Sequence, residues 1–374
     1  MKIVYISDAL AIWGGLERVL TDKVNYLADE YGYEIHLLTA NQGNHPIPYF
    51  MSSKVHHHDL DVRFQQQYKF NVIRRLLLRR RLRRLFVDRL RAYLQAVQPD
   101  VVVSLRLELM SAIAEAKGGI PLVLESHSIR YAERFNQVSK FEQLKTWWYC
   151  RAARHAQMIV ALTEGDANDW RGINKHVCVI PNVVHLNQGA MSKCDSKSVI
   201  FVGRFSHQKD IYSMVLIWKL VHRQRPDWRL DVYGGYGEEK DELLKMIEEA
   251  DANIFVHEPV SDIFEKYRES SILMLTSSFE PFGLVLPEAM SCGVPVVAFD
   301  CPFGPSEIIT DGVDGFIIKK RNIPLFAHRI CHLIDAHDLR LSMGQAGIQS
   351  SQRYQAERIM PRWKELFTQL SSSV

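Results

Sequence analysis

The sequence predicts an α/β protein built from two parallel-sheet domains. Its 374 residues are too many for one comfortable hydrophobic core, and 47% hydrophobic with 24% charged residues is a globular composition. Short runs rich in β-branched residues alternate with helical stretches, which is typical of parallel strands covered by helices. A polar stretch at residues 185–197 interrupts this alternation, which then starts again. We therefore expect two successive α/β domains joined near residue 190.

Six strands are predicted in each half of the chain. Those of the first half are residues 2–7, 34–39, 101–104, 122–125, 158–162 and 177–181. Those of the second half are residues 198–202, 230–234, 254–257, 272–276, 296–299 and 316–318. Because ligands bind beyond the carboxyl ends of strands in open parallel sheets, the two domains are expected to face each other across a cleft lined by strand-to-helix loops.

The predicted domains are residues 1–187 and 188–354, followed by a helical segment at 355–374. This last helix lies too far from any new strand to build a further unit. It is expected to pack back on the first domain through the apolar side chains Ile359, Trp363, Leu366 and Phe367.

The overall charge is close to balanced but unevenly distributed. Lys and Arg number 46 against 43 Asp and Glu, and the formal net charge of +3 excludes a nucleic-acid coat and an acidic disordered tail. Residues 74–91 alone contain nine Arg and one Asp, so this segment carries +8 and the remainder −5. The basic character is therefore local.

The sequence favours a reducing, cytoplasmic location. Its six cysteines form no CxxC pair and have no His at metal-finger spacing, which argues against zinc and against a disulfide framework. The apolar N-terminus is interrupted by Asp8 and is interpreted as a buried strand, not as a signal peptide. No run approaches the roughly 18 apolar residues of a transmembrane helix.

An acidic pair follows the predicted strand 272–276. Glu280 and Glu288 are separated by seven residues, with Gly283 between them and Pro287 in the first turn of a predicted helix. Backbone N–H groups at such a helix start attract an anion, and carboxylates accept hydrogen bonds from sugar hydroxyls. The alternative is two solvated acids flanking a buried helix. Glu280 and Glu288 are therefore candidates to bind sugar hydroxyls, and the backbone of Phe282, Gly283 and Leu284 is a candidate to bind an anion.

Two cations follow the predicted strand 198–202. They are Arg204 and Lys209. An Arg side chain can grip a phosphate bidentately, and a Lys side chain supplies a compact point charge. With no metal cluster in the chain, both are candidates to neutralise a diphosphate leaving group. The alternative is a solvated loop with ordinary charges. Further backbone loops that approach phosphate or sugar contain Gly14, Gly15, Gly203 and Gly235, although none forms a GxGxxG fingerprint.

These motifs together resemble a known family. GGLERVL at Gly14, GRFSHQKD at Gly203, FEPFGLVLPEAMSCGVPVV and DGVDGFII at Asp311 occur in the order and spacing of the retaining GT-B glycosyltransferases of family four. The resemblance covers almost the whole chain, is dense over 198–318 and is thin over 41–95. It implies two Rossmann-like domains, a nucleotide-sugar donor held mostly by the second, an acceptor held mostly by the first, and no metal or other cofactor.

The segment CPFGPSEIITDGVDGF is most similar to the branch that contains capsule, amylovoran and N-glycan-type oligosaccharide transferases. Several of these use UDP-linked hexoses or N-acetylhexosamines on polyprenyl-diphosphate acceptors. The resemblance therefore implies a UDP-sugar donor and a saccharide or lipid-linked saccharide acceptor.

The resemblance also implies roles for individual residues. Arg204 and Lys209 would bind the donor diphosphate, Glu280 and the 282–284 backbone the sugar, and Glu288 the ribose, with Gly14 and Gly15 against the donor phosphates or acceptor. His127, after the strand at 122–125, matches a His that family members carry beside the donor sugar; the alternative is a structural His. Small polar residues at the family's inter-domain face correspond to Thr163 and Asn182. The candidate catalytic residues are Glu280, His127, Arg204 and Lys209.

One motif departs from the family pattern. Residues 56–61 read HHHDLD and combine a His run with a DxD triplet, which in the other large glycosyltransferase fold would hold a metal. The triplet lies far from the diphosphate loop, and adjacent His side chains alternate on a strand, so they do not share one ion. We expect no metal here.

The Arg-rich segment is predicted to be a basic amphipathic helix, because Leu78, Leu82, Leu85, Phe86 and Leu90 recur at helical spacing. It is expected to contact an anionic membrane or an acceptor diphosphate. A solvated face and an RNA-binding arm are the alternatives; nucleic acid is disfavoured because no recognisable module or interleaved aromatics are present. The residues concerned are Arg74, Arg75, Arg79, Arg80, Arg83 and Arg84.

The function expected is therefore a retaining, metal-independent hexosyltransferase without a protein nucleophile, at the inner face of the plasma membrane. Two other functions remain open. One is a sugar-nucleotide epimerase with the same two-domain plan. The other is a catalytically silent sugar-nucleotide-binding protein tethered by its Arg-rich helix.

Overall fold

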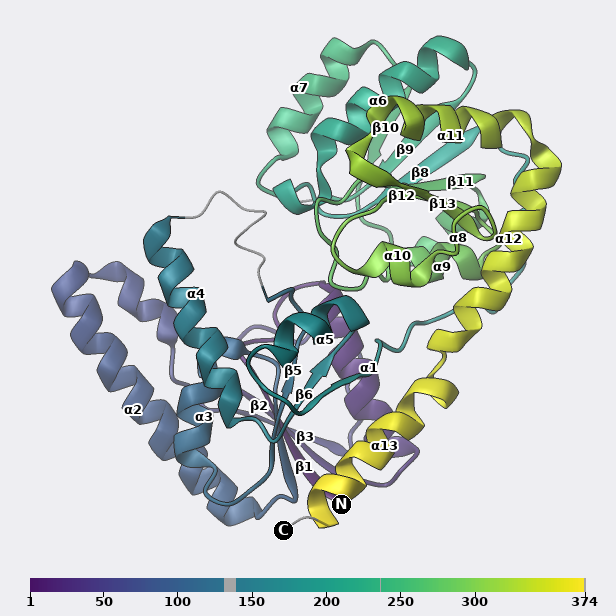
Figure 1. The fold of residues 1–374 in the computed structure, drawn as a ribbon. Coiled ribbons are helices and arrows are strands. Elements are labelled where there is room, and N and C mark those ends of the chain that lie inside the picture. Colours follow the sequence, from purple (N-terminus) through teal and green to yellow (C-terminus); the bar gives the residue numbers. More distant parts are fainter. Residues whose placement is uncertain (131–138, 236, 373–374) are drawn as a thin grey trace. The chain divides into compact units, whose positions relative to one another are not determined.

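The computed structural model describes residues 1–130, 139–235 and 237–372 and divides them into two compact units (Figure 1). Unit 1 comprises the described residues of 1–183 together with the C-terminal segment from residue 356. Unit 2 comprises residues 184–355 as far as they are described. Each unit has a parallel β-sheet at its centre.

The sheet of unit 1 has seven parallel strands in the order β3-β2-β1-β4-β5-β6-β7. Its strands are β1 (Lys2–Ser7), β2 (Glu34–Thr39), β3 (Val55–Asp59), β4 (Val101–Ser104), β5 (Leu122–Glu125), β6 (Met158–Ala161) and β7 (Val177–Val179). The six predicted strands are confirmed, although β6 and β7 end one and two residues early. The strand list missed β3, an edge strand whose His-rich sequence lacks an apolar run.

Helices cover both faces of this sheet, and the alternation of side chains along each strand decides which face they meet. Val4 and Ile6 pack with α2 (Val72–Val97) and α3 (Met110–Ala116), whereas Ile3 and Tyr5 pack with α1 (Gly15–Asp29) and α13 (Ala356–Ser372). These two groups of helices lie on opposite sides of the sheet (Figure 1). The helices of unit 1 are α1 (Gly15–Asp29), η1 (Phe64–Lys69), α2 (Val72–Val97), η2 (Leu107–Leu109), α3 (Met110–Ala116), α4 (Lys140–Ala152), η4 (Ala153–His155), α5 (Glu164–Arg171) and α13 (Ala356–Ser372).

The last helix, α13, belongs to the core of unit 1. The four apolar side chains named from its sequence are all buried, and Trp363 is 1% exposed. Its indole ring lies 4.1 Å from the ammonium nitrogen of Lys23 on α1, a cation–π contact. The apolar stripe of α13 therefore completes the layer that α1 begins.

Unit 2 repeats the strand order of unit 1. Its six parallel strands run β10-β9-β8-β11-β12-β13. They are β8 (Ser198–Val202), β9 (Arg229–Tyr233), β10 (Ile254–His257), β11 (Ile272–Leu275), β12 (Val296–Phe299) and β13 (Gly315–Ile318), and all six predicted strands are confirmed. Its helices are η5 (His207–Lys209), α6 (Ile211–Gln224), α7 (Lys240–Ala250), α8 (Ile263–Arg268), α9 (Val285–Ser291), α10 (Gly304–Ile308), η6 (Lys319–Arg321), α11 (Ile323–Asp335), α12 (His337–Ser351) and η7 (Gln352–Tyr354).

Both sheets have a point where the strand order reverses. In unit 1 it lies between β1 and β4, and in unit 2 between β8 and β11. Connections from these neighbouring strands leave in opposite directions, so the loops beyond their carboxyl ends diverge and leave room for a ligand. Each unit therefore has one expected binding position of its own.

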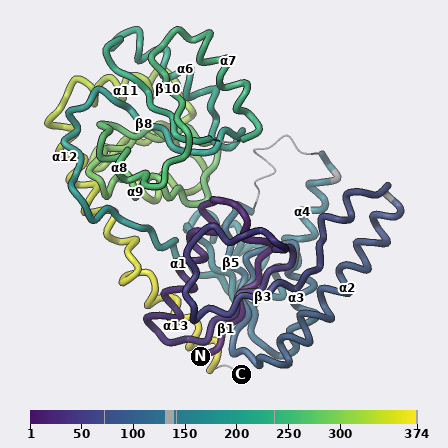
Figure 2. Tube along the Cα trace, turned by 180° about the vertical axis from the view of Figure 1, so that it is seen from behind, coloured from purple at the N-terminus to yellow at the C-terminus, as the bar shows by residue number. Residues whose placement is uncertain are grey.

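The Arg-rich helix is confirmed as α2. The Asn71 side chain caps it by accepting a hydrogen bond from the N–H of Arg74, at 3.2 Å. Leu82, Phe86 and Leu90 are buried against the core of unit 1. Figure 2 shows α2 from behind, beside α3 and α4.

Candidate functional site

The reversal point of unit 2 brings two predicted site residues together. Lys209, in the loop after β8, places its ammonium nitrogen 2.7 Å from Oε2 of Glu280, which follows β11. The hydroxyl of Ser277 donates to the same oxygen at 3.0 Å. Both charged side chains are largely buried, at 13% and 9% exposure. A cation and a carboxylate thus occupy the position where this sheet is expected to bind its ligand.

Arg321, from η6 after β13, holds the two loops at this position. Its guanidinium donates to the carbonyl oxygens of Thr276 and Ser277, each at 2.9 Å, and pairs with the carboxylate of Asp210. The hydroxyl of Thr276 donates to the carbonyl of Lys209 at 2.8 Å. Sequence reasoning missed Arg321 because this contact depends on two non-adjacent strand ends meeting.

Glycines let these loops approach each other closely. A Cβ on Gly203 would lie 3.2 Å from Cε of Lys209, and one on Gly234 would lie 1.9 Å from the carbonyl oxygen of Gly203. A Cβ on Gly235 would lie 2.4 Å from Cδ of Pro259. Gly283, at φ +95°, adopts a backbone conformation that L side chains rarely adopt. Gly234 and Gly235 therefore leave no room for a Cβ, and Gly203 lies directly against the Lys209 side chain.

The remaining predicted residues of unit 2 lie around this pair. Arg204 is exposed, and the described part of the chain gives it no carboxylate partner within 4 Å. Phe282 and Leu284 directly precede α9. Glu288 is buried within α9, and its Oε2 accepts a hydrogen bond from the Tyr267 hydroxyl at 3.2 Å. The two glutamates are therefore not equivalent, because only Glu280 is paired with Lys209.

In unit 1, His127 belongs to a buried charged group. Its Nε2 lies 2.9 Å from Oε1 of Glu125, and the same carboxylate pairs with Lys23 of α1. Burial alone would raise the pKa of Glu125, but the charges of Lys23 and His127 outweigh it and lower that pKa to about 2. Sequence reasoning missed Glu125 and Lys23. The sequence does contain one sign of this pair, because Lys23 lies within the apolar stripe of α1.

Gly14, Gly15 and Thr163, also predicted in unit 1, stand at the starts of helices. Gly14 caps α1, and its carbonyl accepts a hydrogen bond from the Tyr49 hydroxyl at 3.1 Å; Gly15 is the first residue of the helix. Thr163 caps α5 by accepting from the N–H of Asp166 at 3.3 Å. The side-chain oxygen of Asn182 is buried.

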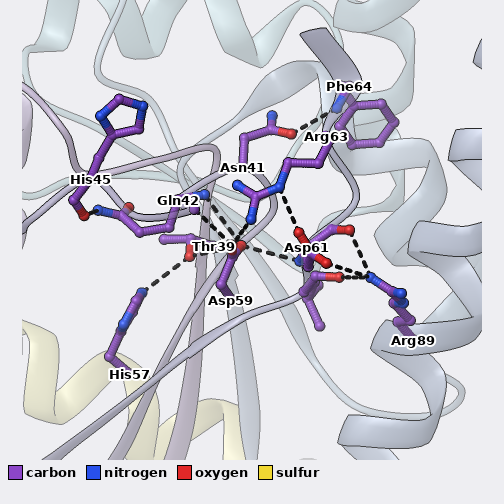
Figure 3. A network of polar contacts seen from close by, with 12 residues as sticks. Thr39, Asn41, Gln42, His45, His57, Asp59, Asp61, Arg63, Phe64 and Arg89 are labelled. Atoms are coloured by element: carbon purple, nitrogen blue, oxygen red, sulfur yellow. Dashed lines mark hydrogen bonds and ion pairs between the residues drawn. The ribbon is translucent and has the colours of Figure 1, made fainter. Parts of the chain in front are cut away.

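The first residue of the DxD triplet, Asp59, binds the loop that follows β2 (Figure 3). The carboxylate of Asp59 accepts backbone hydrogen bonds from Gln42, Gly43 and Asp61 at 3.2, 2.9 and 3.2 Å, and lies 3.4 Å from the guanidinium of Arg63. Burial alone would raise the pKa of Asp59, but these N–H groups and Arg63 outweigh it and lower that pKa. Asp59 therefore holds the loop that follows β2.

The His run alternates across β3. His57 lies 3.1 Å from the Thr39 hydroxyl, whereas His58 stacks on Tyr93 and His56 lies against His36. Within the described ranges, the structure contains no group of three or more His, Cys, Asp or Glu side chains arranged to hold a metal ion.

Two family models match the chain in succession. Residues 13–188 match Glycosyltransferase Family 4, and residues 189–350 match Glycosyl transferases group 1. Together they span nearly the whole chain. The chain is therefore a glycosyltransferase of this family, and the family predicted from its motifs is confirmed.

Known proteins of similar length match along the whole chain. The amylovoran biosynthesis glycosyltransferase AmsD of Erwinia amylovora is 29% identical over 98% of this chain and 99% of its own length. Sucrose-phosphate synthase from Thermosynechococcus elongatus superimposes with a TM-score of 0.83 at 18% identity, over all of both chains. HepE from Anabaena, solved with UDP and glucose, gives 0.75 at 21% identity, over 98% of this chain and 99% of HepE. These structures confirm the GT-B fold.

The hydrogen bonds accepted by Asp59 are expected to stabilise the fold. Replacing Asp59 by Asn should lower the free energy of unfolding by about 2 kcal/mol, because hydrogen bonds to a charged group contribute about 1.5–3 kcal/mol. Asp61→Asn is the matched control, since its side chain is 57% exposed and should lose less than about 1 kcal/mol. Urea unfolding of both variants measures the difference, and equal losses would contradict the role given to Asp59.

Proposed function

We propose that the chain transfers a hexose or N-acetylhexosamine from a UDP-sugar to a saccharide or lipid-linked saccharide, with retention of anomeric configuration, in the assembly of a bacterial surface polysaccharide. The observation that carries this proposal is the Lys209–Glu280 pair at the strand-order reversal of unit 2. The UDP and glucose held by HepE and the amylovoran pathway of the Erwinia relative support the donor and product classes.

The charges of this pair suit a nucleotide diphosphate sugar. Lys209 is a compact cation for the phosphate that gains charge as the donor bond breaks, and exposed Arg204 provides a bidentate phosphate ligand from the same loop. Glu280 accepts hydrogen bonds and so orients sugar hydroxyls. Glu288 is proposed for the ribose hydroxyls and His127 for the sugar or the attacking hydroxyl.

The proposed reaction needs no covalent enzyme intermediate. The bond between the anomeric carbon and the diphosphate oxygen breaks, and its electron pair leaves with UDP. The acceptor hydroxyl oxygen bonds to the anomeric carbon on the face that UDP leaves, and its proton passes to the departing diphosphate. The protein residues bind and orient, and Lys209 and Arg204 supply the charge in place of a metal.

Two substitutions test the proposed donor site. Lys209→Ala should lower kcat by 10²–10³-fold, the range for loss of one group that stabilises developing charge. Glu280→Gln should lower transfer at least tenfold, because the sugar loses its orientation. The measurement is UDP release from a panel of UDP-sugars, with and without saccharide acceptors, on variants of unchanged melting temperature.

Lys245→Ala, on the exposed face of α7, is the matched control and should keep full activity. Full transfer by both site variants would overturn the proposed roles. Formation of an isomerised UDP-sugar without acceptor would instead identify an epimerase. Tight binding of a UDP-sugar without turnover would identify a silent binding protein.

We also propose that unit 1 contacts an anionic membrane. The first turns of α2 expose Ile73, Leu76 and Leu77 at 75%, 51% and 61%, beside exposed Arg74 and Arg75. Neighbouring α4 exposes Leu144, Trp147 and Trp148 at 54%, 49% and 62%. Interfacial aromatics together with basic residues are typical of proteins that lie on a bilayer. No described helix is long and apolar enough to cross a membrane.

Vesicle sedimentation tests this contact. The chain should bind vesicles containing 30% phosphatidylglycerol more tightly than neutral vesicles, and less tightly as salt is raised. Arg74→Ala/Arg75→Ala/Trp148→Ala should bind more than tenfold more weakly, because each basic residue contributes about 1 kcal/mol at an anionic surface. Leu244→Ala/Lys245→Ala, on exposed α7, should bind like the wild type. Equal binding of neutral vesicles would contradict the proposal.

A further inference from the structure

Unit 1 contains a cavity at its own strand-order reversal. Its volume is about 630 Å³, within the range of small-molecule sites. Asp8 and Ala9, after β1, and Arg106, after β4, line it from the two loops that diverge at the reversal. Helices α2 and α4 supply the outer walls. The cavity therefore lies where an open parallel sheet binds its ligand.

The charged side chains that line this cavity are predominantly cationic. Arg79 and Arg83 of α2, Arg106 after β4, and Lys145 of α4 supply four positive charges, against the carboxylates of Asp8 and Glu108. Two of the four cations have a carboxylate partner: Arg83 lies 2.7 Å from Glu115, and Arg106 lies 3.8 Å from Glu108.

Arg79 and Lys145 have no carboxylate within 4 Å among the residues that the structure describes, and both lie at Tyr149. The guanidinium of Arg79 donates to the Tyr149 hydroxyl at 2.6 Å, and the ammonium of Lys145 lies 5.7 Å from the centre of its ring. Two cations without a counter-charge thus come from facing helices to one side of the cavity. An anion bound there would relieve their mutual repulsion.

One wall of the cavity is formed in part by the loop after β2, which hydrogen bonds to Asp59 hold in place (Figure 3). Asn41, which lines the cavity, accepts a hydrogen bond from the N–H of Phe64 at 2.7 Å. Gln42 donates to the carbonyl oxygens of Leu10 and His45 at 2.9 and 2.8 Å. The polar groups of this wall are therefore positioned in advance, which lowers the entropic cost of binding.

We propose that this cavity binds a phosphate or diphosphate ester carried by the acceptor, with Arg79 and Lys145 as its principal ligands. The inference rests on the proposed transferase function and specifies its acceptor. It also divides the Arg-rich helix into two groups. Arg79 and Arg83 line the cavity, whereas Arg74, Arg75, Arg80 and Arg84 do not and are available to a membrane.

Calorimetry with inorganic pyrophosphate tests the site. The full chain carrying Arg204→Ala/Lys209→Ala is used, so that the proposed donor site does not contribute. This protein should still bind pyrophosphate, and adding Arg79→Ala/Lys145→Ala should weaken binding at least tenfold. Adding Arg81→Ala/Arg154→Ala instead should change nothing, since both are exposed residues in or beside the same helices and outside the cavity. Absence of binding, or equal loss in both variants, would overturn the proposal.

Two further probes identify the source of the phosphate. If farnesyl diphosphate binds at least as tightly as pyrophosphate, and if Arg79→Ala/Lys145→Ala weakens its binding, the acceptor is a lipid-linked diphosphate. If glycerol 1-phosphate binds more tightly than either diphosphate, the cavity binds a phospholipid headgroup. That result would overturn the acceptor assignment. These binding measurements need no turnover. Pyrophosphate binding without sugar transfer would therefore refute only the proposed function. Sugar transfer without pyrophosphate binding would refute only the ligand proposed for the cavity.

Discussion

The reversal of strand order within each parallel sheet determines where its loops separate and which charged side chains meet beyond its strands. All strands run in one direction, so every connection must return across a face of the sheet, and the connections on either side of β1 and of β8 must return across opposite faces. The loops beyond the carboxyl ends therefore separate at one position in each sheet. Lys209 and Glu280 meet at that position in unit 2, and the cationic cavity lies there in unit 1.

The two positions have different chemistry because different residues line them. In unit 2 a lysine and a glutamate are paired at 2.7 Å, with Arg321 binding both loops from a third strand end. In unit 1 the cations outnumber the carboxylates, and Arg79 and Lys145 converge on Tyr149. The same strand order thus places a Lys–Glu pair suited to a donor in unit 2. In unit 1 it places a cavity with more cations than carboxylates, which suits an anionic acceptor.

Sequence reasoning predicted most of the fold, because apolar periodicity records which residues are buried. It also placed Lys209 and Glu280 in loops that follow strands 198–202 and 272–276, and these loops meet because β8 and β11 are adjacent. It treated the His run as part of a strand but left β3 out of the strand list, because three histidines replace the apolar alternation there. It also missed Arg321 and the Glu125–Lys23 pair, because their partners lie far away in the sequence and no local pattern marks them.

The proposed function places the nucleotide diphosphate at the reversal point of unit 2. Hydrogen–deuterium exchange of the full chain with and without saturating UDP tests it most directly. We predict slower exchange in residues 203–210 and 276–288, with residues 240–250 of α7 unchanged. Slower exchange confined to unit 1, with residues 203–210 and 276–288 unaffected, would contradict it.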